Sequence, residues 1–224
     1  MVGMTDKDHD LVTAAVTAAE RKSDAEIVTI VAEKSDSYHD VGLHYAVLAM
    51  LLVPALWGFL PQTVIDWAFG LVLGWNHDLT RGTFMLLLFV KLASVFLIVR
   101  YALAYPPLRM ALTPGSTKTR RVRRRAIEMF RVGAEKRTKG RSGVLLYLSL
   151  REHRAEIVAD EAIHSRVTPE MWGEAMAGLI DNVKAGRPGQ GMAEAVEKIG
   201  LVVAECLPKT AENSNELPDR LIVL

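Results

Sequence analysis

Two long apolar stretches constrain this chain more than any other feature of its sequence. They cover residues 41–60 and 83–104, and Lys91 and Arg100 are the only Asp, Glu, Lys or Arg residues in either one. A helix needs about 20 mainly apolar residues, at about 1.5 Å each, to cross a hydrocarbon core of about 30 Å. The sequence therefore predicts a transmembrane helical hairpin over residues 41–105.

Lys91 is the charged residue that lies well inside the second stretch, about eight residues and so about 12 Å from its loop side. A charge at mid-bilayer costs about 2.5 to 3.5 kcal/mol on insertion scales, and the surrounding Leu, Phe, Val and Ile residues outweigh that cost. Two interpretations stay open. The lysine snorkels to the headgroups, or it is a functional intramembrane charge.

Basic residues are distributed unevenly around the two stretches. The predicted outer loop, residues 61–82, has Arg81 as its one clear basic residue, whereas basic residues crowd the segment after the second stretch. Because basic flanks stay on the cytoplasmic side, we expect a multi-pass protein of the bacterial inner membrane with both termini in the cytoplasm. The single cysteine, Cys206, agrees with a reducing compartment. Within the loop, the apolar segment 67–75 is too short to span and predicts an interfacial helix.

The basic run from Lys118 to Arg141 has two interpretations. It is a topology signal on a solvated helix face, or it binds anionic lipid headgroups at up to about 1 kcal/mol per basic residue. The residues predicted to contact lipid are Arg121, Arg124, Arg125 and Lys136. Nucleic acid is excluded as a partner, because no aromatic residues are interleaved with the run and it lies next to the predicted membrane boundary.

The segments on either side of the hairpin complement each other. Residues 1–40 predict a helix, with a stripe of Leu11, Val12, Ala15, Val16 and Ala19, followed by a strand. Residues 106–208 predict a basic amphipathic helix, two strands and two further helices, and the tail, 209–224, ends in an apolar segment that predicts an edge strand. We therefore expect one cytoplasmic α/β domain, a mixed sheet with flanking helices, split in sequence by the hairpin.

Several segments resemble the TPM domain family, named for thylakoid, photosystem II repair and receptor-accessory proteins. They are SDAEIVTIVAEKSDSY, RSGVLLYLSLREHRAEIVADEAIHSRV, the helix around Trp172, GMAEAVEKIG and the closing NELPD. These segments resemble those of a short bacterial branch of the TPM family, whose members carry a transmembrane hairpin after the first strand. The resemblance implies either an acid phosphatase activity, calcium binding or a role as accessory factor to membrane complexes.

One polar cluster carries the candidate chemistry. Asp160, Glu161 and His164 offer two carboxylates and an imidazole to a divalent cation such as calcium, although their spacing matches no metal motif. Exposed loop charges are the alternative interpretation. The sequence shows no nucleophile in a catalytic arrangement, which argues against an enzyme. We therefore expect a membrane-anchored accessory module that has a membrane-protein partner and no cofactor. Homo-oligomers are compatible with this expectation. A metal-assisted phosphatase is the alternative function.

Overall fold

The structure, a computed structural model, describes residues 4–74, 80–133, 142–210 and 220–224. The chain divides into two compact units. The first combines Met1–Asp36 with Gly115–Leu224, and the second is Ser37–Pro114. Each unit is described by itself.

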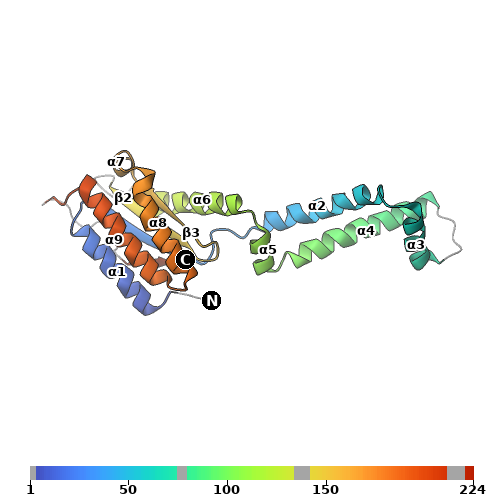
Figure 1. The fold of residues 1–224 in the computed structure, drawn as a ribbon, viewed down its shortest axis with the longest axis horizontal. Coiled ribbons are helices and arrows are strands. Elements are labelled where there is room, and N and C mark those ends of the chain that lie inside the picture. The colour runs from blue at the N-terminus through green and yellow to red at the C-terminus, as the bar shows by residue number, and fades with distance from the viewer. Residues whose placement is uncertain (1–3, 75–79, 134–141, 211–219) are drawn as a thin grey trace. The chain divides into compact units, whose positions relative to one another are not determined.

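A four-stranded mixed sheet forms the centre of the first unit (Figure 1). Its strands are β1 (Glu26–Ala32), β2 (Gly143–Ser149), β3 (Arg154–Ala159) and β4 (Ile222–Val223), in the order β3-β2-β1-β4. The central strand β1 pairs in parallel with β2 and with β4, and β2 pairs antiparallel with β3. Every residue of β1 and β2 is buried, as their continuous apolar runs predict. The expected mixed sheet is confirmed.

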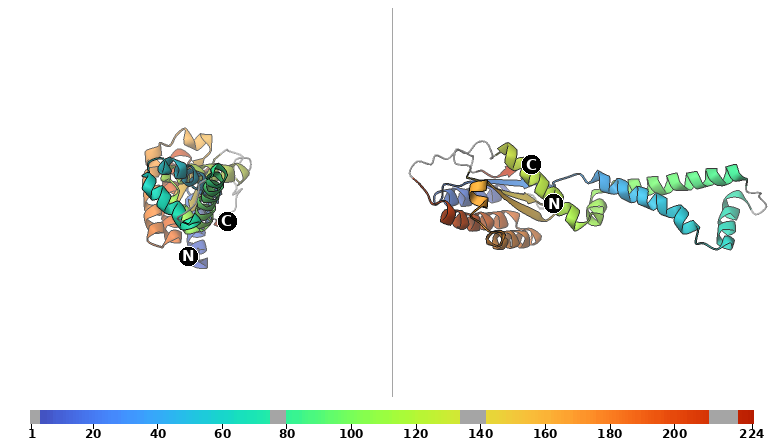
Figure 2. Two further views of the ribbon diagram at one scale, coloured as in Figure 1. Left: turned by 90° about the vertical axis from the view of Figure 1, so that its right-hand side faces the viewer. Right: turned by 90° about the horizontal axis from the view of Figure 1, so that it is seen from above.

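Helices cover both faces of the sheet, so that the sheet lies between two helical layers (Figures 1 and 2). The helices of this unit are α1 (Asp6–Glu20), α6 (Gly115–Gly133), α7 (Glu161–His164), α8 (Pro169–Lys184) and α9 (Pro188–Cys206). Side chains alternate along a strand, and Val144 therefore packs with α1, α8 and α9 while Leu145 packs with α6. The flanking helices expected from the sequence are thus present.

The N-terminal helix α1 begins at a capping box. The Thr5 side chain accepts a hydrogen bond from the Asp8 N–H, and the Asp8 carboxylate accepts one from the Thr5 N–H at 2.8 Å. Val12 and Val16 are fully buried against α9, as the predicted stripe requires. Leu11 is the exception. This residue is 46% exposed, because only the other four residues of the predicted stripe face the core.

The second unit contains the two apolar stretches as helices. Its elements are α2 (His39–Trp57), α3 (Gln62–Leu73), α4 (Arg81–Ala102) and α5 (Pro106–Leu112). The helices α2 and α4 are long and apolar enough to cross a membrane, with mean hydropathy of 1.6 and 2.4. Only 17% of the most apolar window of α2 is buried in the protein, and none of that of α4 is. Helix α3 overlaps the segment 67–75, for which the sequence predicted an interfacial helix.

A buried arginine on α5 links the start of α2 to the end of α4 in this second unit. The Arg109 guanidinium, on α5, contacts the His39 ring at 3.3 Å and donates to the Leu103 carbonyl at 3.2 Å. Arg109 is 6% exposed. Pro106 begins the short helix α5, because proline fits the first turn of a helix, where its missing N–H costs nothing.

Candidate functional site

A cleft opens at one edge of the sheet in the first unit. The parallel strands β1, β2 and β4 all end at this edge, and residues that close or follow them line the cleft: Val31, Glu33, Leu150, Arg151, Val223 and Leu224. Its volume is about 570 Å³. The carboxyl ends of parallel strands are where ligands bind in open α/β sheets. The fold therefore places the cleft where a binding site is expected.

Charged groups surround an apolar lining in this cleft. The Arg151 guanidinium forms an ion pair with Glu33, which joins the ends of β1 and β2. Lys184 enters from the end of α8 and lies 3.7 Å from Asp181. His153 is exposed and has a φ of 47°, a left-handed conformation that closes the short connection from β2 to β3. This mixture suits a ligand that has an apolar body and an anionic group.

Nothing in the sequence marked Arg151 or Lys184 as site residues, because neither belongs to a catalytic or ligand-binding motif and 32 residues lie between them in the chain. The apolar strands were the signal in the sequence that could have located this cleft, because residues that follow parallel strands gather at one edge of the sheet.

The residues predicted to bind a metal lie at the opposite end of β2. Strand β3 runs antiparallel to β2, so Asp160, which follows β3, lies beside Gly143, which begins β2. The Asp160 carboxylate accepts a hydrogen bond from the Gly143 N–H at 2.9 Å, and Asp160 is 7% exposed. The sequence suggested a loop for Glu161 and His164. They are instead exposed on the short helix α7. Among the described residues, no three His, Cys, Asp or Glu side chains converge to hold a metal ion.

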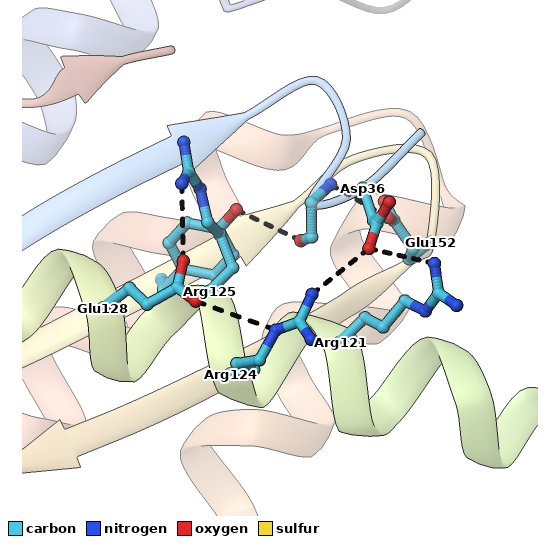
Figure 3. A network of polar contacts seen from close by, with 8 residues as sticks. Asp36, Arg121, Arg124, Arg125, Glu128 and Glu152 are labelled. Atoms are coloured by element: carbon cyan, nitrogen blue, oxygen red, sulfur yellow. Dashed lines mark hydrogen bonds and ion pairs between the residues drawn. The ribbon is translucent and has the colours of Figure 1, made fainter. Parts of the chain in front are cut away.

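The basic helix α6 forms ion pairs within its own unit (Figure 3). Arg121 lies 2.9 Å from Asp36, and its side chain is only 14% exposed. Arg124 lies 3.5 Å from Asp36 and 3.7 Å from Glu128, and Arg125 lies 3.5 Å from Glu128. Arg121, a predicted lipid contact, therefore pairs with Asp36 in the segment that follows β1. The predicted lipid contact Lys136 lies outside the described residues.

One side of α6 carries three exposed arginines. Arg120, Arg124 and Arg131 are spaced four and seven residues apart and therefore share one side of the helix. All three residues are exposed. Arg121 is engaged with Asp36, and Arg124, although exposed, also pairs with Asp36 and Glu128. Arg120 and Arg131 are therefore the better candidates for contact with an anionic surface.

A buried polar group lies beneath α6. Tyr147 is fully buried on β2, and its hydroxyl lies 3.1 Å from the Ser35 hydroxyl. Burial raises the pKa of the Tyr147 phenol, and the hydrogen bond from Ser35 opposes this only in part. The nearby Glu152 carboxylate accepts hydrogen bonds from the Ser35 N–H at 2.9 Å and from the Ser149 hydroxyl. These bonds fix the segment that follows β1.

Glu156 on β3 is the second group in this unit with a shifted proton affinity. Burial raises the pKa of its carboxyl, and the nearby Arg123 and Arg154 oppose that shift without cancelling it. A raised carboxyl pKa is common at acid-base sites. Glu156 is not among the described residues that line the cleft, and its shift follows from the packing of β3 under α6.

Lys91 is the charged residue in the middle of α4. Its Nζ lies 5.9 Å from the centroid of the Trp57 ring, at the end of α2. A cation over an aromatic face gains about 2 kcal/mol when it is desolvated, which offsets most of the insertion cost of about 2.5 to 3.5 kcal/mol. The structure thus gives this lysine an aromatic neighbour that the sequence did not indicate.

Comparisons with known proteins support part of the resemblance described above. The model of the TPM domain family matches residues 108–202. This range includes α6, β2, β3, α7, α8 and most of α9. No curated protein sequence matches the chain.

A solved structure has a similar fold. It is the NMR structure of the BA42 protein from the psychrophilic bacterium Bizionia argentinensis, which superposes with a TM-score of 0.55. The two sequences are 15% identical, and the alignment covers 99% of this chain and 95% of that chain. At this identity the likeness shows a shared fold. The chain thus carries a TPM domain match over residues 108–202 within a mixed α/β fold.

Proposed function

We propose that this protein is a membrane-anchored accessory module that acts with other membrane proteins. In this proposal α2 and α4 cross the bacterial inner membrane, and the first unit, a TPM-like domain split in sequence by the hairpin, lies in the cytoplasm. The observation that carries the proposal is the exposure of the two apolar helices. A core helix of a soluble protein is mostly buried, whereas no part of the most apolar window of α4 is.

Charge supports the orientation. The described residues between α2 and α4 contain no arginine or lysine, and Arg81 begins α4, whereas α5 and α6 carry many basic residues. This difference favours a cytoplasmic location for the first unit and for both termini.

The cleft at the carboxyl edge of the sheet supports the binding role. Its apolar lining, with Arg151 and Lys184 at the margin, suits a ligand that has an apolar body and a carboxylate or phosphate. We take this ligand to be a segment of the membrane-protein partner. The metal-assisted phosphatase stays the alternative prediction, with Asp160, Glu161 and His164 as its metal ligands and calcium as a suitable ion.

Single-cysteine labelling tests the topology. In a Cys206→Ser background, Thr63→Cys on α3 and Ser116→Cys on α6 each provide one exposed thiol. In intact spheroplasts, we expect a membrane-impermeant maleimide to label Thr63→Cys at once and Ser116→Cys only after permeabilisation. Labelling of both positions in intact cells, or recovery of the wild-type chain in the soluble fraction, would contradict the proposal.

A second experiment separates the module from the enzyme. Turnover of a phosphomonoester by the purified chain, dependent on an added divalent cation and lost in Asp160→Ala, supports the phosphatase. Absence of turnover, together with a membrane protein that cross-links to the wild type and not to Arg151→Glu, supports the module.

A further inference from the structure

A groove lies beside Lys91 within the second unit. Its volume is about 260 Å³. Trp57 at the end of α2 and Phe69 of α3 form one side, and their rings pack edge to face at 5.7 Å between centroids. The other side is a stripe of α4, formed by Leu87, Val90, Lys91 and Ser94, whose three- and four-residue spacing places them on one face. Among the described residues that line this apolar groove, Lys91 is therefore the one charged group.

The described part of the chain does not supply an anion for Lys91. Among the described residues, no carboxylate forms an ion pair with it. Between residues 41 and 102 the sequence has only two acidic residues, Asp66 and Asp78, and neither is in α2 or α4. A second copy of the chain would bring another lysine to the same depth, which is repulsive. The complementary charge must come from a different molecule.

Lipid headgroups are too far along the helix to provide that charge. Lys91 is ten residues from Arg81 and eleven from Ala102, so it lies about 15 Å from either end of α4. An extended lysine side chain covers less than half of this distance, so snorkelling does not carry the ammonium to the phosphates. The Nζ instead lies over the Trp57 ring.

We propose that this groove docks a transmembrane helix of a partner protein that carries an aspartate or glutamate near the middle of its span. The partner carboxylate pairs with Lys91, and its helix packs along Leu87 and Val90. Ser94, one turn from Lys91, offers a second hydrogen-bond donor to the same carboxylate. Ionisable residues inside a membrane pair with one another, which makes an acidic residue the partner that this charge requires. The inference rests on the proposed function, because it requires α4 to lie in a bilayer.

Synthetic transmembrane peptides test this proposal directly. The full chain, labelled with a donor at Thr63→Cys in the Cys206→Ser background, is reconstituted in neutral phosphatidylcholine vesicles. Acceptor-labelled leucine-rich peptides carry Asp, Asn or Leu at their central position. We expect energy transfer to show that the Asp peptide associates about tenfold or more tightly than the Leu peptide. Lys91→Met should abolish that preference, and the matched variant Lys91→Arg, which keeps the charge, should retain it.

The outcomes distinguish this inference from the proposed function. Insertion is checked in the same vesicles by the protection of α2 and α4 from added protease. If the chain does not insert, the anchored module and the docking groove both fail. If it inserts and the Asp and Leu peptides associate equally, or if Lys91→Met keeps the preference, the docking groove alone is overturned. Loss of the Asp preference when anionic lipid is added would show that Lys91 binds headgroups, which also overturns it.

Discussion

Asp160 and Gly143 close the sheet at the start of β2 with two hydrogen bonds. The Asp160 N–H donates to the Gly143 carbonyl at 2.9 Å, and the Gly143 N–H donates to the Asp160 carboxylate at 2.9 Å. Asp160 is also the N-cap residue of α7, where the Ile163 N–H donates to its carbonyl. A residue that appeared to be a metal ligand therefore has a structural role that joins β2, β3 and α7.

Replacing Asp160 should destabilise the protein more than replacing its two neighbours in the predicted metal site. Asp160→Ala leaves the buried Gly143 N–H unsatisfied and should lower the free energy of unfolding by about 1 to 3 kcal/mol. Glu161→Ala and His164→Ala remove exposed side chains and should each change it by less than about 0.5 kcal/mol. Chemical denaturation of the full chain in detergent measures all three. A rise in the melting temperature with calcium, lost equally in the three variants, would instead support the metal site.

Two glycines on helices should respond to alanine in opposite directions. A Cβ at Gly200 of α9 would lie 2.6 Å from the Ala19 Cβ and 3.3 Å from the Ala19 Cα of α1. Because backbone cannot yield easily, Gly200→Ala should cost about 1 to 3 kcal/mol of the free energy of unfolding. A Cβ at Gly173 of α8 meets nothing within 4 Å, so Gly173→Ala should add up to about 1 kcal/mol through helix propensity. Equal effects in thermal melts would show that α1 and α9 do not pack so closely.

Glu156 should make the protein less stable as the pH rises from acid to neutral. Its folded-state pKa is raised above the unfolded value, so the folded state binds more protons in the interval between the two. The stability that protonated Glu156 contributes is therefore complete below about pH 4.5 and is lost as the pH rises through the folded pKa. Glu156→Gln imitates the protonated form, so it should raise the stability at pH 7 and remove this part of the slope. Urea unfolding between pH 4 and pH 7 measures both effects, and an unchanged slope would contradict the assignment.

The exposed arginine stripe of α6 should hold the first unit close to anionic lipid. A fluorophore on Ser116→Cys, near Arg120 on α6, reports this distance through quenchers attached to lipid headgroups. Replacing Arg120 and Arg131 together with Gln should reduce quenching in anionic vesicles, and added salt should reduce it in the wild type, since the Debye length falls from about 8 Å to about 3 Å at 1 M.

Two control variants sharpen this measurement. Arg151→Gln makes the same kind of charge change in the cleft and should not alter the quenching. Arg121→Gln removes the ion pair with Asp36 and should lower the unfolding free energy rather than lipid contact. Quenching that is equal in neutral and anionic vesicles would leave the basic run as a topology signal.

Local patterns in the sequence determined most of the secondary structure. The two strands predicted within residues 106–208 correspond to β2 and β3, and the two further helices predicted there correspond to α8 and α9. The apolar tail predicted an edge strand, and β4 pairs with β1 there. These predictions hold because strand length, helical periodicity and turn residues are properties of neighbouring residues. The length and apolar character of α2 and α4 were readable for the same reason.

Tertiary structure alone decided which side chains meet. The direction of β3 places Asp160 at one edge of the sheet. The parallel pairing of β1 and β2 brings Glu33 and Arg151 together at the other edge, where the end of α8 adds Lys184. Neither consequence follows from residue spacing, because contacts across a sheet depend on strand order and direction. Helical phase showed that Arg121 lies on the polar side of α6. Only the path of the chain after β1 revealed that Asp36 lies there to pair with it.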